Sequence, residues 1–251
     1  MKITVITVVY NGENTIKKTI ESVLAQEVQP YEYLIIDGAS SDNTVRVAES
    51  YRTAFEKNNV IYRIVSERDS GIYDAFNKGV RLSMGEFIAF LNADDWYEPT
   101  ALKVVQETYT REPFDFAYGT IQYVGAKGNI LKKKSKLDIF VSSRNWNHPS
   151  SFVRRELYLD NPFDQTLKVY ADFDWFLKIR KQNVRIVIFP GDAVIAHFRA
   201  GGASINADFG KTLERAKEKA FAYQRNGYSG IYMIEAYAWE FVKYIFSKIF
   251  T

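Results

Sequence analysis

Two adjacent carboxylates, Asp94 and Asp95, give the clearest indication of chemistry in this chain. They follow an apolar run at residues 86–91, and Asn92 lies between the run and the pair. Adjacent residues in a turn point in different directions, so one carboxylate could hold a hard divalent cation while the other, or Asn92, bonds a ribose hydroxyl. The pair could equally cap a helix that starts near Pro99. Both interpretations place a turn at the end of a buried strand.

The chain lacks the glycine-rich loops that usually hold phosphates. The segment VYNGE at residues 9–13 has one glycine where a dinucleotide fold needs Gly-x-Gly-x-x-Gly, and no Walker loop occurs. A diphosphate would therefore need a cation that carboxylates bind. There is no cysteine and there are two histidines, which excludes a disulfide scaffold, a Cys-based zinc site and a His-rich metal site. Any metal must be held mostly by oxygen.

Four apolar, β-branched runs alternate with segments of helical spacing over the first hundred residues. We expect strands at residues 2–10, 33–36, 60–65 and 86–91. Helices are expected at residues 16–24 and 72–82, with a single helix of about four turns over residues 45–55. Right-handed crossovers then produce a mostly parallel, twisted sheet with helices on both faces, so the expected fold class is α/β.

Polar residues follow each of these strands, and the topology should bring them together. In a parallel α/β sheet, ligands bind beyond the carboxyl ends of the strands. The groups at those ends are Asn11, Asp37, the loop at residues 67–69 and the segment at residues 92–95. Asp37 could accept the imino hydrogen of a uracil ring. We therefore expect one crevice lined largely by carboxylates.

The pattern is less regular after residue 100. Residues 116–124 alternate like one strand, and residues 129–131 could return as a hairpin. We expect a helix at residues 172–181, a strand at residues 185–189 and a glycine-rich segment at residues 200–203. These patterns divide the chain into residues 1–210, with a change of character near residue 100, and a helical C-terminal appendage at residues 211–251.

Four ordered blocks of the sequence resemble the inverting family 2 glycosyltransferases, which have the glycosyltransferase-A fold. The blocks are ITVVYN at residues 6–11, IIDGASSDNT at 35–44, DSGIYDAFNKG at 69–79 and GEFIAFLNADD at 85–95. Weaker matches continue to about residue 205. The resemblance implies transfer of a sugar from a nucleotide diphosphate donor, inversion at the anomeric carbon, and a divalent ion, manganese or magnesium. It makes residues 1–100 the nucleotide-sugar-binding half and residues 101–210 the acceptor and catalytic half.

The resemblance also assigns roles to residues of these blocks. Thr7, Tyr10, Asn11, Asp37, Asp69, Asn92 and Asp94 would serve the nucleotide, and Asp94 and Asp95 would bind the metal. Asn92 stands where the aspartate-rich motif usually begins with aspartate, so it keeps hydrogen bonding but loses a charge. Phe76 stands where many members have arginine, and no donor contact is carried over from that position.

Asp172 matches the position of the family's catalytic base. It lies in YADFDWFL at residues 170–177, with Ala171 where a glutamate is usual. An inverting enzyme needs a base that takes the proton of the acceptor hydroxyl, and the N-terminus of a helix favours an ionised carboxylate. A simple capping aspartate is the structural alternative. The resemblance places His148 and Asp174 on the acceptor side.

His197 follows the apolar residues 193–196. The fold often supplies a late histidine as a further metal ligand, and we favour that role for His197. The alternative is a half-buried histidine whose hydrogen bonds are satisfied by its neighbours.

The basic excess of the chain lies in its C-terminal segment. The whole chain carries +3, which is no argument for nucleic acid as a partner. Residues 211–251 contain seven basic and four acidic residues, 7 − 4 = +3. A helix over residues 231–250 would have one apolar face, which could pack on the domain, pair with a second copy in a homodimer, or lie in a membrane interface. The lysines at residues 132–136 are expected to be solvated, or to meet phosphate on a lipid-linked acceptor.

No apolar run reaches the length of a membrane span, and the first residues lack the cleavage site of a signal peptide. We therefore expect a cytoplasmic protein, with peripheral contact at the inner face of the membrane as an option. The leading hypothesis is a metal-dependent inverting glycosyltransferase that moves a sugar from a UDP-sugar to a glycan or lipid-linked saccharide in polysaccharide biosynthesis. The alternatives are a sugar nucleotidyltransferase and a noncatalytic nucleotide-sugar-binding protein.

Overall fold

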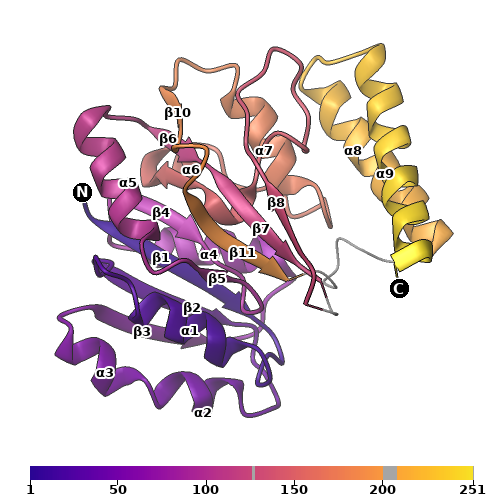
Figure 1. Ribbon diagram of the computed structural model, residues 1–251. Helices are drawn as coiled ribbons and strands as arrows, with labels where there is room; N and C mark the ends of the chain where they lie inside the picture. The colour runs from indigo at the N-terminus through magenta and orange to yellow at the C-terminus, as the bar shows by residue number, and fades with distance from the viewer. Residues whose placement is uncertain (126–127, 200–207, 251) are drawn as a thin grey trace.

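The computed structural model describes residues 1–125, 128–199 and 208–250. Within them the chain forms a central sheet covered by helices, a second, smaller sheet and a C-terminal pair of helices (Figure 1). The glycine-rich segment expected at residues 200–203 lies outside the described residues.

The central sheet has seven strands in the order β10-β6-β9-β4-β1-β2-β3. Its strands are β1 (Ile3–Val9), β2 (Glu32–Asp37), β3 (Ile61–Ser66), β4 (Phe87–Phe90), β6 (Phe116–Tyr118), β9 (Phe152–Arg154) and β10 (Ile186–Ile188). β9, which the sequence pattern did not predict, runs antiparallel to β4 and β6, and the other pairs are parallel. The sheet is therefore mostly parallel as expected, and β1, β2 and β4 end at one edge.

Two apolar layers cover this sheet. α1 (Ile16–Leu24), α2 (Thr44–Glu49), α3 (Arg52–Lys57) and α5 (Ala101–Arg111) contribute to one layer, and α4 (Ile72–Leu82), α6 (Arg155–Asp160) and α7 (Ala171–Ile179) to the other. Successive side chains of a strand point to opposite faces, so in β1 Val5 belongs to the first layer and Ile6 to the second. This two-sided burial explains why the strands are continuous apolar runs.

The helix expected over residues 45–55 is divided into α2 and α3. The Ser50 hydroxyl donates a hydrogen bond to the carbonyl oxygen of Val47 at 2.6 Å, and the Tyr51 amide donates to that of Ala48 at 3.2 Å. Both bonds reach back three residues, which tightens the turn and ends α2. Phe55 is nevertheless buried, so the apolar spacing that predicted one helix is preserved in two.

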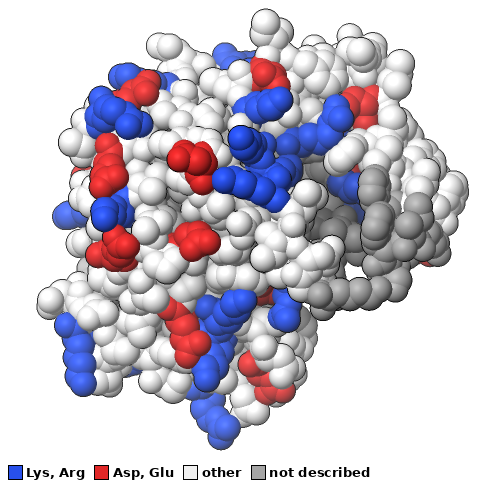
Figure 2. Space-filling model, in the orientation of Figure 1, with Lys and Arg blue, Asp and Glu red and all other residues white. Residues whose placement is uncertain are grey.

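The second sheet has four strands in the order β5-β11-β7-β8. They are β5 (Trp96–Tyr97), β7 (Thr120–Val124), β8 (Ile130–Lys133) and β11 (Val194–Arg199). The strand expected over residues 116–124 is divided between the two sheets at Gly119, whose carbonyl oxygen accepts hydrogen bonds from Ser135, Asn147 and Ser150 at 2.6, 3.1 and 2.8 Å. The expected hairpin is confirmed as the antiparallel pair β7–β8. Figure 2 shows Lys and Arg side chains gathered over the region of β7 and β8.

The C-terminal helices α8 (Phe209–Arg225) and α9 (Ile231–Phe250) lie side by side, and α8 packs against α7 (Figure 1). In α9 the carboxylates of Glu235 and Glu240 are turned inward and buried, whereas Ile234 is 69% exposed. Buried charges need partners, and here Lys219 lies 2.8 Å from Glu235 and Arg215 lies 2.9 Å from Glu240. The face of α9 that packs on the domain therefore combines these carboxylates with Ala236 and the partly buried Tyr232 and Met233. Among the described helices, none combines the length and the apolar character needed to cross a bilayer.

Candidate active site

The loops that follow β1 and β2 are held together by hydrogen bonds at the edge of the sheet. Asn11 has a positive φ of 51°, a conformation that asparagine adopts more readily than most residues. Its amide donates to Ser40 Oγ at 2.7 Å, and its Oδ1 accepts from the Ser41 amide at 2.9 Å. The Gly12 amide donates to Thr44 Oγ1 at 2.8 Å. Asn11 therefore fixes the shape of this edge through its backbone amide and its Oδ1.

Tyr10, Gly38 and Asp69 form an accessible surface beside these loops. Tyr10 is 67% exposed. A Cβ placed on Gly38 would lie 3.4 Å from Tyr10 Cδ2 and 2.7 Å from Asp69 Oδ2, so both side chains closely approach the Gly38 backbone. Asp69 Oδ1 accepts a hydrogen bond from the Gly71 amide at 3.0 Å. An exposed ring beside a carboxylate can stack on a nucleobase and bond its edge.

Asp37 and Thr7 lie beneath that surface. Both are fully buried. Asp37 Oδ1 accepts from Ser40 Oγ at 2.5 Å, its Oδ2 accepts from Ser66 Oγ at 2.6 Å, and the Thr7 hydroxyl lies 3.0 Å from that of Tyr33. The expectation that Thr7 contacts a nucleotide is wrong, because its side chain points into a helix-covered face of the sheet. Asp37 organises the loop in this structure, and Asp69 is the more exposed of the two carboxylates.

Asn92, Asp94 and Asp95 follow β4 and include buried oxygens that have no hydrogen-bond partner. Asp95 is 1% exposed, and its Oδ1 accepts from the Arg199 amide at 3.0 Å. Its Oδ2 and the Oδ1 of Asn92 are buried and unpaired. Burial and the neighbouring Asp94 charge raise the pKa of Asp95 well above its usual value, and burial raises the pKa of Asp94. Unpaired oxygens and destabilised carboxylates at one strand end fit a hard cation.

His197 does not join this group. Its Nε2 lies 2.8 Å from Glu98 Oε1, and its ring stacks on Trp96 with centroids 5.0 Å apart. The register of β11 against β5 pairs His197 with Trp96, which directs the imidazole to that contact. In this structure His197 is a half-buried histidine with one hydrogen-bonded and one unpaired ring nitrogen, and its role as a metal ligand stays a prediction. Within residues 1–125, 128–199 and 208–250, no three His, Asp or Glu side chains converge as a complete ligand set.

Asp172 lies in the first turn of α7, where it contacts side chains from α4 and from the short 3₁₀ helix η1 (His148–Ser150). Its Oδ1 accepts from the Phe173 amide at 2.7 Å and lies 3.3 Å from the Tyr73 hydroxyl, and its Oδ2 lies 3.6 Å from His148 Nδ1. Burial raises the pKa of Asp172 to about 6 and lowers the pKa of His148 to about 4. Near pH 7 this is a carboxylate beside a neutral imidazole. Such a carboxylate can accept a proton.

His148 connects Asp172 with the end of β4. Its ring centroid lies 5.6 Å from that of Phe90 and 5.5 Å from that of Phe76. Phe90 is the last residue of β4 and precedes Asn92 by two residues. The His148 ring therefore directly contacts the strand that Asp94 and Asp95 follow. Phe76, which replaces an arginine of the resembling family, packs on this histidine. The tertiary structure therefore brings Asp172 and His148 close to the strand that carries Asp94 and Asp95.

Asp174 belongs to a different contact. It is 5% exposed and accepts hydrogen bonds from the Arg225 guanidinium and from Asn226 Nδ2, the latter at 2.7 Å. Two residues along a helix rotate the side chain by about 200°, so Asp174 cannot face the same way as Asp172. The expectation that Asp174 lies on the acceptor side is wrong. Asp174 joins α7 to the end of α8.

Two residues near Asp172 were not identified from the sequence. Tyr73 occupies an apolar position of α4, but its hydroxyl donates to the Val169 carbonyl oxygen at 2.7 Å. Glu218 of α8 accepts hydrogen bonds from the backbone amides of residues 168–170. A tyrosine within an otherwise apolar helix face is a signal from which Tyr73 could have been identified. Nothing in the sequence around Glu218 points to α7.

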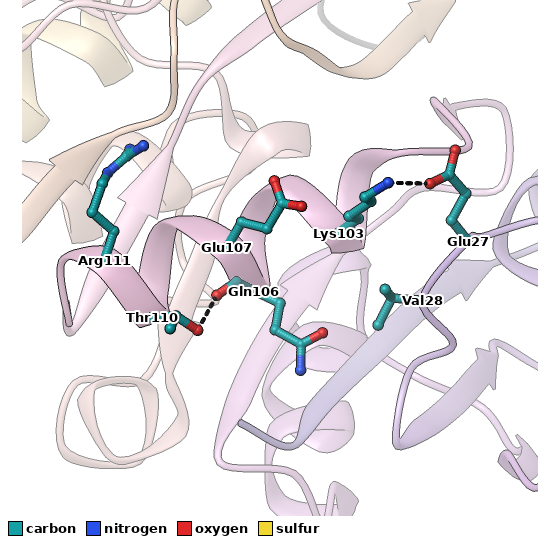
Figure 3. A pocket seen from close by; sticks show the side chains of 7 residues that line it. All are labelled: Glu27, Val28, Lys103, Gln106, Glu107, Thr110 and Arg111. Atoms are coloured by element: carbon teal, nitrogen blue, oxygen red, sulfur yellow. Dashed lines mark hydrogen bonds and ion pairs between the residues drawn. The ribbon is translucent and has the colours of Figure 1, made fainter.

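A separate hollow of about 600 Å³ lies against α5 (Figure 3). It is lined by Glu27, Val28, Lys103, Gln106, Glu107, Thr110 and Arg111. Lys103 Nζ and Glu27 Oε2 form an ion pair at 2.9 Å. None of these lining residues belongs to the group around Asp172 or to the end of β4, so the candidate active site does not include this hollow.

The sequence of this chain is similar to one enzyme family and to individual named enzymes. The family described as glycosyl transferase family 2 matches residues 4–179. The chain is 28% identical over 207 residues to the PGL/p-HBAD biosynthesis glycosyltransferase of Mycobacterium tuberculosis, which covers 77% of each chain. It is 27% identical over 176 residues to the chondroitin synthase of Escherichia coli, which covers 68% of this chain and 25% of that protein.

The fold is similar to two solved structures. S. aureus TarS 1–349 in complex with UDP-GlcNAc superposes with a TM-score of 0.66 at 20% identity, covering 98% of this chain and 73% of that chain. The mannosyltransferase PcManGT from Pyrobaculum calidifontis, in complex with GDP-Man and Mn²⁺, superposes with a TM-score of 0.66 at 16% identity, again covering 98% and 73%. These likenesses confirm the expected α/β fold of the glycosyltransferase-A type.

Proposed function

This chain belongs to glycosyl transferase family 2 and is a glycosyltransferase, and we propose that it moves a sugar, with inversion, from a nucleotide diphosphate donor to a saccharide acceptor. The observation that carries the proposal is the position of Asp172. This carboxylate has a pKa raised to about 6 and contacts His148, which in turn packs on β4. The relatives are named as glycosyltransferases and polysaccharide synthases, which disfavours a sugar nucleotidyltransferase.

In the proposed reaction Asp172 acts as the general base. The acceptor hydroxyl oxygen forms a bond to the anomeric carbon from the face opposite the leaving group, and the hydroxyl proton passes to a carboxylate oxygen of Asp172. The bond between the anomeric carbon and the diphosphate oxygen breaks, and the nucleoside diphosphate leaves with the electron pair. The side chain of Asp172 is 23% exposed, which leaves it accessible to a hydroxyl. His148 is neutral at pH 7 and so does not neutralise the base.

We propose that Asp94 and Asp95 hold a divalent cation, manganese or magnesium, with Asn92 Oδ1 as a further oxygen donor. The unpaired buried oxygens of Asn92 and Asp95 support this assignment, as does the Mn²⁺ in the PcManGT complex. When bound, the cation would neutralise charge on the diphosphate leaving group. Without it, the carboxylates of this strand end would repel the phosphates.

The donor in this proposal is a UDP-sugar. The exposed Tyr10 ring would stack on the uracil, and Asp69 would accept the imino hydrogen. UDP-GlcNAc in the TarS complex supports a uridine donor, whereas GDP-Man in the PcManGT complex supports a guanosine donor as the alternative. The identity of the base is therefore the first property to measure.

A thermal-shift screen of UDP, GDP and their sugars, with and without Mn²⁺, tests this proposal. A ligand that binds only the native state at one hundred times its Kd stabilises it by about 2.7 kcal/mol. We expect UDP to raise Tm only when Mn²⁺ is present. Replacing Asp94 and Asp95 together with alanine should abolish the metal-dependent shift, while Asp192→Ala at an exposed position should keep it. An unchanged Tm shift in the folded double variant contradicts the metal assignment. A separate donor-hydrolysis assay tests for catalysis, and absence of hydrolysis favours a noncatalytic binding protein.

We further propose a lipid-linked saccharide acceptor, reached by peripheral contact of the C-terminal helices with a membrane. Ile139 is 97% exposed, and the neighbouring Phe140 stacks on Tyr232 of α9 at 4.8 Å. A shallow hollow of about 340 Å³ between this loop and α9 is lined mostly by apolar side chains, including Ile234, and by Arg144 and Glu235, whose charged groups lie 3.7 Å apart. Exposed apolar side chains on a helix face favour an interface with lipid. A homodimer through the same face is the alternative.

A further inference from the structure

The turn that leads into α7 is held by a carboxylate from the C-terminal helix pair. Glu218 Oε1 accepts hydrogen bonds from the amides of Val169 and Tyr170 at 2.7 and 2.6 Å, and its Oε2 accepts from the Lys168 amide at 3.1 Å. These three amides precede Ala171, the first residue of α7, and therefore have no acceptor within the helix. Tyr170, at the N-cap position of α7, makes no side-chain capping bond. Glu218 therefore satisfies three backbone donors from another element.

The same turn is held from α4 on the donor half of the chain. The Tyr73 hydroxyl donates to the Val169 carbonyl oxygen at 2.7 Å and lies 3.3 Å from Asp172 Oδ1. Residues 168–170 thus lie between α4 and α8, and Asp172 follows them by two residues. The position of the proposed base relative to the donor half depends on both contacts.

α9 reinforces this arrangement. The Tyr170 hydroxyl donates a hydrogen bond to Glu240, and Glu240 lies 2.9 Å from Arg215 of α8. Both members of that ion pair are buried, and Lys243 of α9 lies 2.5 Å from the other carboxylate oxygen of Glu240, so this buried charge is compensated by two cations. α8, α9 and the turn before α7 therefore form one connected hydrogen-bonded unit.

We propose that Glu218 is a positioning residue for sugar transfer, which makes the C-terminal helix pair a structural part of the active site. By fixing residues 168–170, Glu218 sets the location of Asp172 in the first turn of α7. The inference rests on the proposed function, because it takes Asp172 as the base.

The charge of Glu218 provides a readout that a purely structural role would not move. The titratable groups facing Asp172 are Tyr73, His148, Tyr158 and Tyr170, in addition to Glu218. Burial raises the pKa of the three tyrosines and lowers that of His148 to about 4, so these groups are neutral at pH 7. The negative Glu218 raises the pKa of Asp172. Removing that charge should therefore lower the pKa of the base.

The test compares Glu218→Ala and Glu218→Gln with Glu214→Gln, a matched change one turn earlier at an exposed position of α8. Each full-length variant is measured for UDP affinity, for kcat and KM of transfer, and for the pH dependence of kcat. We expect Glu218→Ala to keep UDP affinity within about twofold and to lower kcat by about tenfold to a hundredfold, since small displacements of a reacting group cost that much. In Glu218→Gln, which retains an acceptor oxygen, the acid limb of the profile should move to lower pH.

Wild-type kcat in Glu218→Ala would overturn the proposal, and so would losses of UDP affinity and kcat that match the unfolded fraction. If Glu218→Ala does not fold, an acid limb of Glu218→Gln at the wild-type pH would overturn it. Asp172→Asn separates this inference from the function on which it rests. Undiminished turnover in Asp172→Asn would refute Asp172 as the base, whereas a defect in Asp172→Asn without one in the Glu218 variants would refute only the positioning role.

Discussion

Replacing Asp172 with asparagine should abolish most of the activity and at the same time stabilise the protein at alkaline pH. Burial raises the pKa of this carboxyl to about 6 from the ordinary value of 3.8. Asparagine has nearly the same shape and can still accept the hydrogen bond of the Phe173 amide, but it cannot take a proton from a hydroxyl. The variant therefore removes the charge and the basicity while retaining most of the packing.

The expected magnitudes follow from this pKa. With a value of about 6, roughly one tenth of the free enzyme has an ionised base at pH 5 and roughly nine tenths at pH 7, so kcat/KM should fall about tenfold below its plateau at pH 5. A shift of about two pKa units corresponds to about 3 kcal/mol. Because the pKa is raised in the native state, this stability is present below about pH 3.8 and is lost as the pH rises through about 6. Asp172→Asn should therefore gain up to about 3 kcal/mol relative to wild type at pH 8, and little at pH 4.

Initial rates between pH 4.5 and 8.5, together with urea denaturation of both proteins at pH 4.5 and pH 8, measure the two effects. We expect turnover of the variant to fall by about a hundredfold or more, with UDP affinity retained. A wild-type acid limb near pH 4, or a stability difference that does not change with pH, would refute the argument that burial raises this pKa. His148 does not produce the limb near pH 6, because burial lowers its pKa to about 4.

Three further changes test other parts of the structure. Asp174→Asn weakens the contact with Arg225 and should lower the free energy of unfolding, measured in urea titrations, by about 2 kcal/mol while UDP affinity stays the same. A loss of UDP affinity in the folded variant would show that Asp174 belongs to the active site. Gly38→Ala places a Cβ 2.7 Å from Asp69 Oδ2 and should weaken UDP binding measured by calorimetry. The control Gly191→Ala, whose Cβ would have no atom within 4 Å, should leave the affinity unchanged. Equal UDP affinities of the two variants would show that the nucleoside does not bind beside Gly38. Ile234→Asp should reduce flotation of the protein with anionic vesicles while its Tm stays unchanged. If the wild-type protein does not float and the variant changes from dimer to monomer, this face is a subunit interface instead.

Local sequence pattern was sufficient for most elements of the first hundred residues and for the polar groups at the strand ends, although it missed the division between α2 and α3 and the short strand β5. The helices expected from the apolar spacing of residues 16–24 and 72–82 are present in the structure, since that spacing lies within each segment itself. The position of Asp94 and Asp95 directly after a buried strand was likewise readable from neighbouring residues. Pattern failed at Gly119, because the division of residues 116–124 between two sheets depends on contacts with distant Ser and Asn side chains.

The partners of the charged and polar side chains depend on how distant segments pack, and local pattern contains no information about that. His197 bonds Glu98, Asp174 bonds Arg225, and the amides before α7 bond Glu218, each across a long stretch of chain. α9 shows the physical reason most clearly. An isolated amphipathic helix is expected to bury its apolar face only. The inward face of α9 instead combines Ala236, Tyr232 and Met233 with two buried carboxylates, which Arg215 and Lys219 of α8 compensate, while Ile234 and Ile245 stay exposed.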